Sequence, residues 1–138
     1  MPDVSTLEAF KRAVTSAKAV AVAESTSGIY FTSNLLPRLG IGERVNVKVT
    51  PRATGATAMV AAGDADLVVM PVSEILHAAG VALAGTLPAE IQLVQVFAAA
   101  VVAGSKEPDA GRRLIEFLAS ERAMAVIQKS GMEPVGKH

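Results

Sequence analysis

Three polar junctions in this sequence have the residue types that bind a small anion. They cover residues 25–28 (STSG), 52–56 (RATGA) and 70–73 (MPVS), and each follows a predicted strand and opens a predicted helix. The first turn of a helix has unpaired N–H groups and partial positive charge, which favour anions. Hydroxyl groups add donors, and an arginine adds charge. The predicted ligand-binding residues are Thr26, Ser27, Gly28, Arg52, Thr54, Gly55 and Ser73.

Each junction also has a simpler interpretation. Ser, Thr and Gly are common at helix starts, because they satisfy or accommodate the unpaired N–H groups there. In that interpretation the hydroxyl residues are ordinary caps, Arg52 is a solvated charge and Ser73 is a plain N-cap. Tyr30, the only tyrosine, then serves packing within its helix. The residues alone leave both interpretations open.

The familiar enzyme motifs are missing from the sequence. Its two histidines, His77 and His138, have no partner at the spacing of a metal site or a catalytic triad. Neither Gly-x-Ser-x-Gly nor the phosphate-binding Gly-x-x-x-x-Gly-Lys-Ser/Thr pattern occurs. Asp64 and Asp66 flank a strand start and are interpreted as solvated loop acids. We therefore predict that the chain is not an enzyme and that it uses no metal or cofactor.

Length and composition favour one α/β domain with a core of small side chains. The chain has 138 residues and no Cys, and it is 51% hydrophobic but only 4% aromatic. Its 13 basic and 13 acidic residues give zero formal net charge, which argues against nucleic-acid binding. No apolar stretch is long enough to span a bilayer, and no secretory leader pattern opens the chain. The expected location is the cytoplasm, or the periplasm if an export signal was removed.

Helical and extended patterns alternate along the chain. Strands are predicted at residues 18–23, 45–49, 65–70, 81–83 and 94–102. Helices are predicted at residues 6–17, 28–39, 55–62, 73–77, 106–118 and 121–130. Ser5, Thr54 and Ser120 are the expected caps of three of these helices, and Pro37 should kink or end another. The alternation predicts an α/β fold with a mainly parallel sheet flanked by helices and with right-handed crossovers.

Four segments, taken in order, resemble the second half of a known family. They are residues 28–41, 55–76, 85–92 and 96–134. The last has the pattern AAVVAGSK-x-P-x-A…L-x-F-L-x-S…G-x-E-P, which ends at Gly131, Glu133 and Pro134. These segments are similar to the molybdate-binding type of ABC-transporter periplasmic solute-binding protein, which has the type 2 periplasmic-binding fold. The similarity covers residues 5–134.

This resemblance implies a function for the junctions. Members of the family hold an oxyanion without a countercharge, through backbone N–H and hydroxyl donors. The residue aligned with Ser27 donates its N–H to the ligand, whereas Met70 or Pro71 stands where many members have a ligand-contacting Tyr. The implied function is binding of a small oxyanion or a similar solute, with an ABC permease as partner.

The resemblance also implies how a single solute-binding domain, residues 1–138, is divided. Residues 5–104 would form the second of two lobes, and residues 105–134 would be helices that normally pack on a first lobe with no counterpart here. Their apolar faces would then need another cover. The residues concerned are Leu114, Ile115, Phe117, Leu118, Val126 and Ile127. We expect a homodimer, with exchange of the C-terminal helices as one geometry.

Two further functions stay open at this stage. A truncated or vestigial module would act through homo-oligomerisation and would ignore anions. A ligand-sensing domain detached from a regulator is the third alternative, although the sequence contains no recognisable DNA-binding module. Saturable thermal stabilisation by an anion would favour the binding module over the vestigial one.

Overall fold

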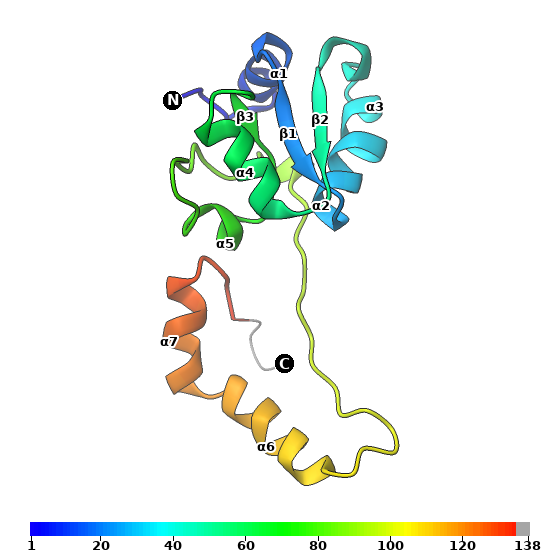
Figure 1. Cartoon of the computed structure of the whole chain (residues 1–138), viewed down its shortest axis with the longest axis vertical. Coiled ribbons are helices and arrows are strands. Elements are labelled where there is room, and N and C mark those ends of the chain that lie inside the picture. The colour runs from blue at the N-terminus through cyan, green and yellow to red at the C-terminus, as the bar shows by residue number, and fades with distance from the viewer. Residues whose placement is uncertain (135–138) are drawn as a thin grey trace. The chain divides into compact units, whose positions relative to one another are not determined.

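The computed structural model describes residues 1–134, so His138 lies outside the described residues. The chain forms two compact units, Met1–Leu93 (unit 1) and the part from Val94 onward (unit 2). Unit 1 contains the sheet and the first five α-helices, and unit 2 contains α6 and α7 (Figure 1). All predicted ligand-binding residues belong to unit 1.

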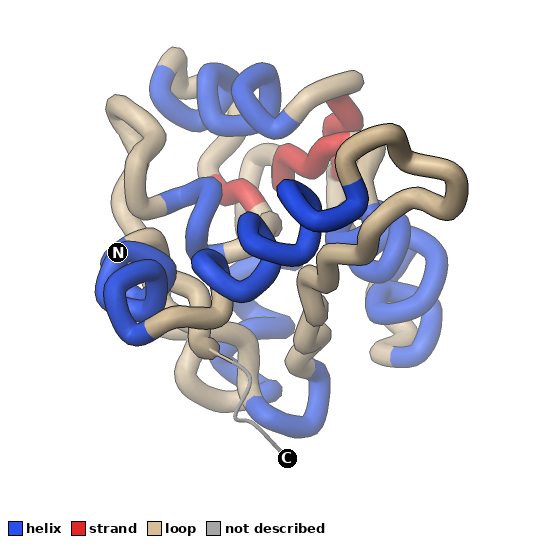
Figure 2. The backbone as a smooth tube through the Cα atoms, turned by 90° about the horizontal axis from the view of Figure 1, so that it is seen from below, coloured by secondary structure: helices blue, strands red, loops and turns tan. Residues whose placement is uncertain are grey.

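A parallel sheet forms the centre of unit 1. Its strands, in the order β2-β1-β3, are β2 (Val47–Thr50), β1 (Val20–Ala23) and β3 (Leu67–Val68). Val20 of β1 is opposite Val47 on one side and Leu67 on the other. Figure 2 shows how small a part of the chain the strands (red) occupy. The predicted α/β class with a parallel sheet between helices is confirmed, although the strands are shorter than predicted.

Alternation along β1 gives the sheet two different faces. Val20 and Val22 belong to the larger core cluster, together with Phe31 of the continuous helix over residues 26–38, the second helix of the chain. Ala21 belongs to the other core cluster, together with Ala56 of α4 (Ala53–Ala61). Successive strand residues face opposite sides, so helices cover both faces, as right-handed crossovers to β2 and β3 require.

The first helix, α1 (Leu7–Ser16), has a different cap from the one predicted. Thr6 is the N-cap, and its hydroxyl accepts the N–H of Ala9 at 3.2 Å. Ser5 instead donates its N–H at 2.9 Å and its hydroxyl at 2.7 Å to Oδ1 of Asp3. The prediction of Ser5 as the cap is therefore wrong, because the carboxylate of Asp3 engages Ser5 before the helix begins.

The second helix runs without a break from Thr26 to Arg38. Its parts are α2 (Thr26–Ile29), a π-helical segment (Tyr30–Leu35) and α3 (Leu36–Arg38). Pro37 has no N–H to donate, and the wider π-helical turns end just before it. The helix ends one residue after Pro37, as predicted, and Gly40 follows with a φ of 66°.

The next two helices are α4 (Ala53–Ala61) and α5 (Val72–Ile75). Arg52 is the N-cap of α4, and Thr54 lies inside its first turn. Pro71 is the N-cap of α5, and Ser73 lies inside that helix. The predictions that Thr54 and Ser73 are caps are wrong. Both helices begin earlier, with no side-chain cap, because Ala53 and Val72 enter the helical conformation directly.

Two 3-10 turns complete unit 1. Gly42–Arg44 leads into β2, and Ala89–Ile91 precedes the end of the unit. The hydroxyl of Tyr30 donates to the carbonyl oxygen of Ile91 at 3.0 Å, so this tyrosine holds the second turn on the second helix. Residues 81–83, predicted as an edge strand, form no strand.

Unit 2 contains α6 (Pro108–Leu118) and α7 (Glu121–Lys129), close to the predicted bounds. Ser120 caps α7 as predicted, and its hydroxyl accepts the N–H of Ala123 at 3.4 Å. The prediction of a strand at residues 94–102 is wrong, since this part is an irregular segment (Figure 1). A strand needs a hydrogen-bonding neighbour, and no other described segment pairs with this one.

The helices of unit 2 expose large apolar side chains. Leu114 is 58% exposed, Phe117 is 51%, Leu118 is 45% and Val126 is 63%. The other two residues of the predicted apolar faces, Ile115 and Ile127, are half-buried. Within unit 2 itself these side chains are therefore not covered by the neighbouring helix, and what covers them stays a prediction.

Candidate functional site

The three predicted junctions follow the strands of one parallel sheet. Residues 25–28 follow β1, residues 52–56 follow β2 and residues 70–73 follow β3. Parallel strands end on the same edge of a sheet, so the three junctions lie along its carboxyl edge. Ligands of open α/β sheets bind outside this edge. The fold therefore brings the predicted residues together, while their role in binding stays a prediction.

Gly28 determines how closely the second helix approaches β1. A Cβ atom built on Gly28 would lie 1.9 Å from the carbonyl oxygen of Ala23. That oxygen belongs to the backbone, so no rotamer change makes room for a side chain. Gly28 is itself buried, and its main role is to seat the helix N-terminus against the end of β1.

Ser25 caps this helix in the ordinary way. Its hydroxyl accepts the N–H of Gly28 at 3.5 Å and lies 3.1 Å from the hydroxyl of Ser27. The N–H groups of Thr26 and Ser27, in the first turn, have no acceptor within the helix. Thr26 is exposed and Ser27 is half-exposed. The junction thus combines a plain cap with N–H and hydroxyl donors that a solute can reach.

Thr50, which sequence reasoning missed, joins the first two junctions. Its hydroxyl can donate to the carbonyl oxygen of Val22, at 3.3 Å, or of Arg52, at 2.8 Å. Its own carbonyl oxygen accepts the N–H of Glu24 at 2.8 Å. Thr50 therefore fixes the first residues after β1 relative to the first residues after β2. The available signal was its place between the alternating residues 45–49 and Pro51, where the strand ends.

The second junction offers a charge and a hydroxyl to a ligand, but fewer free backbone N–H donors than predicted. The N–H of Gly55 already donates to the carbonyl oxygen of Arg52 at 3.0 Å. A Cβ atom on Gly55 would lie 3.2 Å from the Cβ atom of Thr50, so Gly55 keeps α4 close to β2. Thr54 and the side chain of Arg52 are exposed. Gly55 is consequently a packing residue first, and Arg52 and Thr54 carry the chemistry.

Glu24 and Arg52 place one charge of each sign at the first two junctions. Glu24 directly follows β1, and Arg52 is the second residue after β2. Both are exposed, and within residues 1–134 neither side chain makes a hydrogen bond or an ion pair. Glu24 was missed because the predicted site was chosen for anion donors alone. A cation and a carboxylate on one edge can hold an acidic solute and exchange a proton with it.

The third junction offers the fewest donors to a ligand. Helix α5 is a single turn, and Ser73 is half-buried in it without a side-chain capping bond. Met70 packs against the alanine-rich core cluster, where it has no polar atom to offer a ligand. The geometry therefore centres the site on the first two junctions.

Asp64 and Asp66 lie before β3, away from this edge. Oδ2 of Asp66 accepts the N–H of Lys18 at 2.7 Å, at the opposite, amino edge of the sheet. The carbonyl oxygen of Asp64 accepts Nζ of Lys48 at 3.2 Å. In the described part of the chain, no three His, Asp or Glu residues are grouped so that they could hold a metal ion. No helix among residues 1–134 has the length and apolar character needed to cross a membrane.

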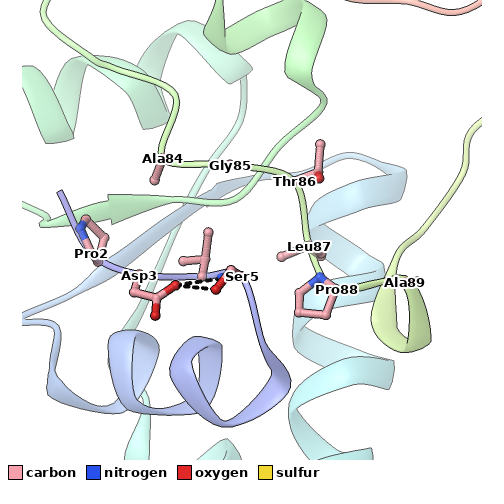
Figure 3. Close-up of a pocket in the computed structure, with 10 residues that line it drawn as sticks. Pro2, Asp3, Ser5, Ala84, Gly85, Thr86, Leu87, Pro88 and Ala89 are labelled. Atoms are coloured by element: carbon pink, nitrogen blue, oxygen red, sulfur yellow. Dashed lines mark hydrogen bonds between the residues drawn. The ribbon is translucent and has the colours of Figure 1, made fainter.

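A cavity of about 450 Å³ lies elsewhere in unit 1, lined by residues 2–5 and 84–89 (Figure 3). Asp3 is the only charged residue of its lining. The hydroxyl of Ser5, and then its N–H, hydrogen-bond to Asp3 and lower the pKa of that carboxyl. The cavity contains none of the predicted ligand-binding residues, and its negative charge does not favour an anion.

Comparison with known proteins gives the chain a family. Residues 1–133 match the family model described as bacterial extracellular solute-binding protein. No solved structure gave a significant match.

A curated relative is named aconitate isomerase and comes from Pseudomonas sp. The two sequences are 34% identical over 135 residues, which make up 97% of this chain and 52% of the relative. The chain therefore spans about half the length of the curated relative that it matches.

The name of this relative contradicts the prediction that the chain is not an enzyme, and that prediction is wrong. It was based on missing nucleophile, phosphate-binding and metal motifs. Moving a proton within a substrate requires none of these motifs, because one positioned carboxylate can act as the base.

Proposed function

The chain belongs to the bacterial extracellular solute-binding protein family, and from that premise we propose that it binds a small polycarboxylate anion at the carboxyl edge of its sheet. The observation that carries the proposal is the placement of Arg52, Thr54, Thr26 and Ser27 along this one edge. The name of the aconitate isomerase relative supports a carboxylate, since aconitate is an unsaturated tricarboxylate.

The residues divide the work of binding between charge and hydrogen bonds. The exposed guanidinium of Arg52 suits a carboxylate, because its planar donors match both oxygens. The N–H groups of Thr26 and Ser27 suit a second carboxylate at the start of a helix that continues to Arg38. Thr54 adds a hydroxyl. Tetrahedral oxyanions, favoured by the resemblance to molybdate-binding proteins, fit the same donors and belong in the test.

Thermal unfolding of the chain tests this proposal. The melting temperature is measured with trans-aconitate, citrate, molybdate and sulfate, each over a range of concentrations. Saturable stabilisation, about 2.7 kcal/mol at a hundredfold excess over Kd, is expected for a tricarboxylate. If molybdate alone stabilises the chain, the ligand is a tetrahedral oxyanion and not a polycarboxylate. If no anion has an effect, the proposal is wrong.

Arg52→Gln tests whether this arginine binds the anion. It removes the charge and keeps a polar side chain, so the Kd for trans-aconitate is expected to rise about 10-fold or more. Arg44→Gln is the control, because Arg44 is also exposed but precedes β2, at the amino edge. Equal weakening by both variants would indicate general charge attraction in place of a site.

We also propose that a second copy of the chain covers the apolar helix faces of unit 2. The support is the exposure of Leu114, Phe117 and Val126. Analytical ultracentrifugation should show a dimer that Phe117→Asp dissociates. A monomer at micromolar concentration would remove this proposal and leave anion binding untouched.

A location outside the cytoplasm is a further proposal, supported by the family description. Delivery of the solute to an ABC permease is the transport role that fits such a location. Fractionation of cells that produce the protein from its native gene would place it in the periplasm if the proposal is right.

A further inference from the structure

We infer that Glu24 is the general base that moves a proton within the bound polycarboxylate, which would make this edge of the sheet an isomerase site. The inference rests on the proposed function, because it needs a bound substrate with an acidic C–H bond. It adds a reaction and a residue to what is otherwise a binding site.

The position of Glu24 is the first support. It is the first residue after β1, the central strand, and its N–H is held by the carbonyl oxygen of Thr50 at 2.8 Å. The backbone at Glu24 is therefore fixed by the sheet, while its side chain is exposed. Ser25 begins the cap of the second helix immediately afterwards. Glu24 thus directly precedes the cap of the helix that supplies N–H donors, and its backbone is bonded to Thr50, two residues before Arg52.

The free state of the carboxylate is the second support. Within residues 1–134, the side chain of Glu24 has no hydrogen-bond or ion-pair partner. Asp66, by contrast, accepts a backbone N–H, and Asp3 accepts two hydrogen bonds from Ser5. A base has to be free to accept a proton. Glu24 meets this condition at the first junction, where the ligand donors lie, and Glu74 of α5 meets it beside the third junction, which has fewer donors.

The reaction balances without another reagent. In an unsaturated tricarboxylate, the carboxylate of Glu24 takes a proton from the saturated carbon of the allylic system. The C–H electron pair then spreads over the allylic carbons and the attached carboxylates. Protonated Glu24 returns the proton to the carbon at the other end, and the double bond moves by one position. The positive charge of Arg52 stabilises the negative charge that develops on the carboxylate it binds.

Glu24→Gln tests the inference, because it keeps the size of the side chain and removes the base. Binding of trans-aconitate is measured by thermal unfolding, and its conversion and deuterium uptake are followed by proton NMR in D2O. The variant is expected to bind within about threefold of the wild-type chain, since one exposed carboxylate near the anion contributes little to affinity. Its conversion is expected to fall about 100-fold or more.

Two glutamates serve as comparisons. Glu43→Gln changes an exposed acid in the 3-10 turn before β2, at the amino edge, and should leave conversion unchanged. Glu74→Gln changes the exposed acid of α5, on the same side of the sheet as Glu24. Loss of conversion in Glu74→Gln, with conversion retained in Glu24→Gln, would assign the base to α5 and overturn the inference.

The remaining outcomes separate this inference from the proposed function. If the wild-type chain binds trans-aconitate but neither converts it nor takes up deuterium, the inference fails and the binding function stands. If Glu24→Gln converts it as fast as wild type, only the role of Glu24 fails. If the wild-type chain binds citrate but not trans-aconitate, the inference fails and the proposed function stands. If it binds neither tricarboxylate, the proposed function fails and the inference fails with it.

Discussion

The polar residues next to the strands have different partners at the two edges of the sheet. At the amino edge, the residues around Lys18 bond to one another: Asp66 accepts the N–H of Lys18 at 2.7 Å, and the amide of Asn46 donates to the carbonyl oxygen of Lys18 at 2.8 Å. The side chains of Glu43 and Arg44, in the turn before β2, are exposed at this edge without such a bond among the described residues. At the carboxyl edge, the side chains of Glu24 and Arg52 are exposed and have no such partner among the described residues.

This difference separates structural polar residues from residues available to a ligand. A polar group that is already bonded within the protein must break that bond before it can bind a solute. At the carboxyl edge, the structural contacts come from the backbone and hydroxyl of Thr50 and from the close approach of Gly28 to Ala23, and the side chains of Glu24 and Arg52 have no partner among the described residues. The amino edge is therefore expected to influence stability, and the carboxyl edge to influence binding.

Among the variants that test this difference between the edges, Gly28→Ala should have the largest effect on the free energy of unfolding. The new methyl group would meet the backbone oxygen of Ala23, so the helix has to move away from β1. A loss of about 3 kcal/mol in the free energy of unfolding is expected, at the upper end of typical overpacking costs. Urea unfolding followed by circular dichroism measures it.

Gly42→Ala is the matched control for Gly28→Ala. The nearest atom to a Cβ at Gly42 is the Cβ of Leu36, at 4.0 Å, which is an ordinary contact. This variant should stay within about 0.5 kcal/mol of wild type. Similar losses in the two variants would mean that the close approach at Gly28 does not limit the fold.

Asp66→Ala should lower stability without changing anion binding. It removes the acceptor for the N–H of Lys18, a bond that joins the turn before β3 to the residues before β1. The expected loss is about 1 kcal/mol, as is usual for a single hydrogen bond. The same urea experiment measures it, and a changed Kd for trans-aconitate would contradict the division between the two edges.

The sequence was sufficient to predict the three strands of the sheet and that the three junctions after them would share one edge. Alternation in residues 45–49 and the apolar runs around β1 and β3 located all three strands, and a parallel sheet then required their carboxyl ends to meet. It did not predict the individual bonds at that edge. The bond from the hydroxyl of Thr50 to the carbonyl oxygen of Val22 depends on a distance between segments far apart in the chain, and the engaged N–H of Gly55 depends on where α4 begins.

Residues 94–102 show the limit of strand prediction. Their β-branched composition favours extended backbone, but a strand exists only where another strand offers hydrogen bonds. No such neighbour is present in the described part of the chain, and no local pattern encodes that fact. The wrong caps at Ser5, Thr54 and Ser73 have a related cause, because a competing acceptor or an earlier helix start decides which residue serves as the cap.

Arg52→Gln and Glu24→Gln should sharpen the comparison by leaving stability almost unchanged. Neither side chain has an internal partner among residues 1–134, so each variant should stay within about 0.5 kcal/mol of wild type in the free energy of unfolding. Asp66→Ala, measured beside them, should show the larger loss. A loss above about 1 kcal/mol in either carboxyl-edge variant would reveal a structural role there.

Asp3→Asn should have the smallest effect, and that effect should depend on pH. Hydrogen bonds from the hydroxyl and the N–H of Ser5 hold the pKa of Asp3 below its ordinary value in the folded protein. The ionised carboxylate therefore favours the folded state above the unfolded pKa, about 3.9, and this contribution disappears as the pH falls through the lowered value. Urea unfolding at neutral pH should show a slight loss for Asp3→Asn, and the two proteins should converge in acid. A difference that persists in acid would show that the Asn side chain changes the turn by shape, because the charge is then absent from both proteins.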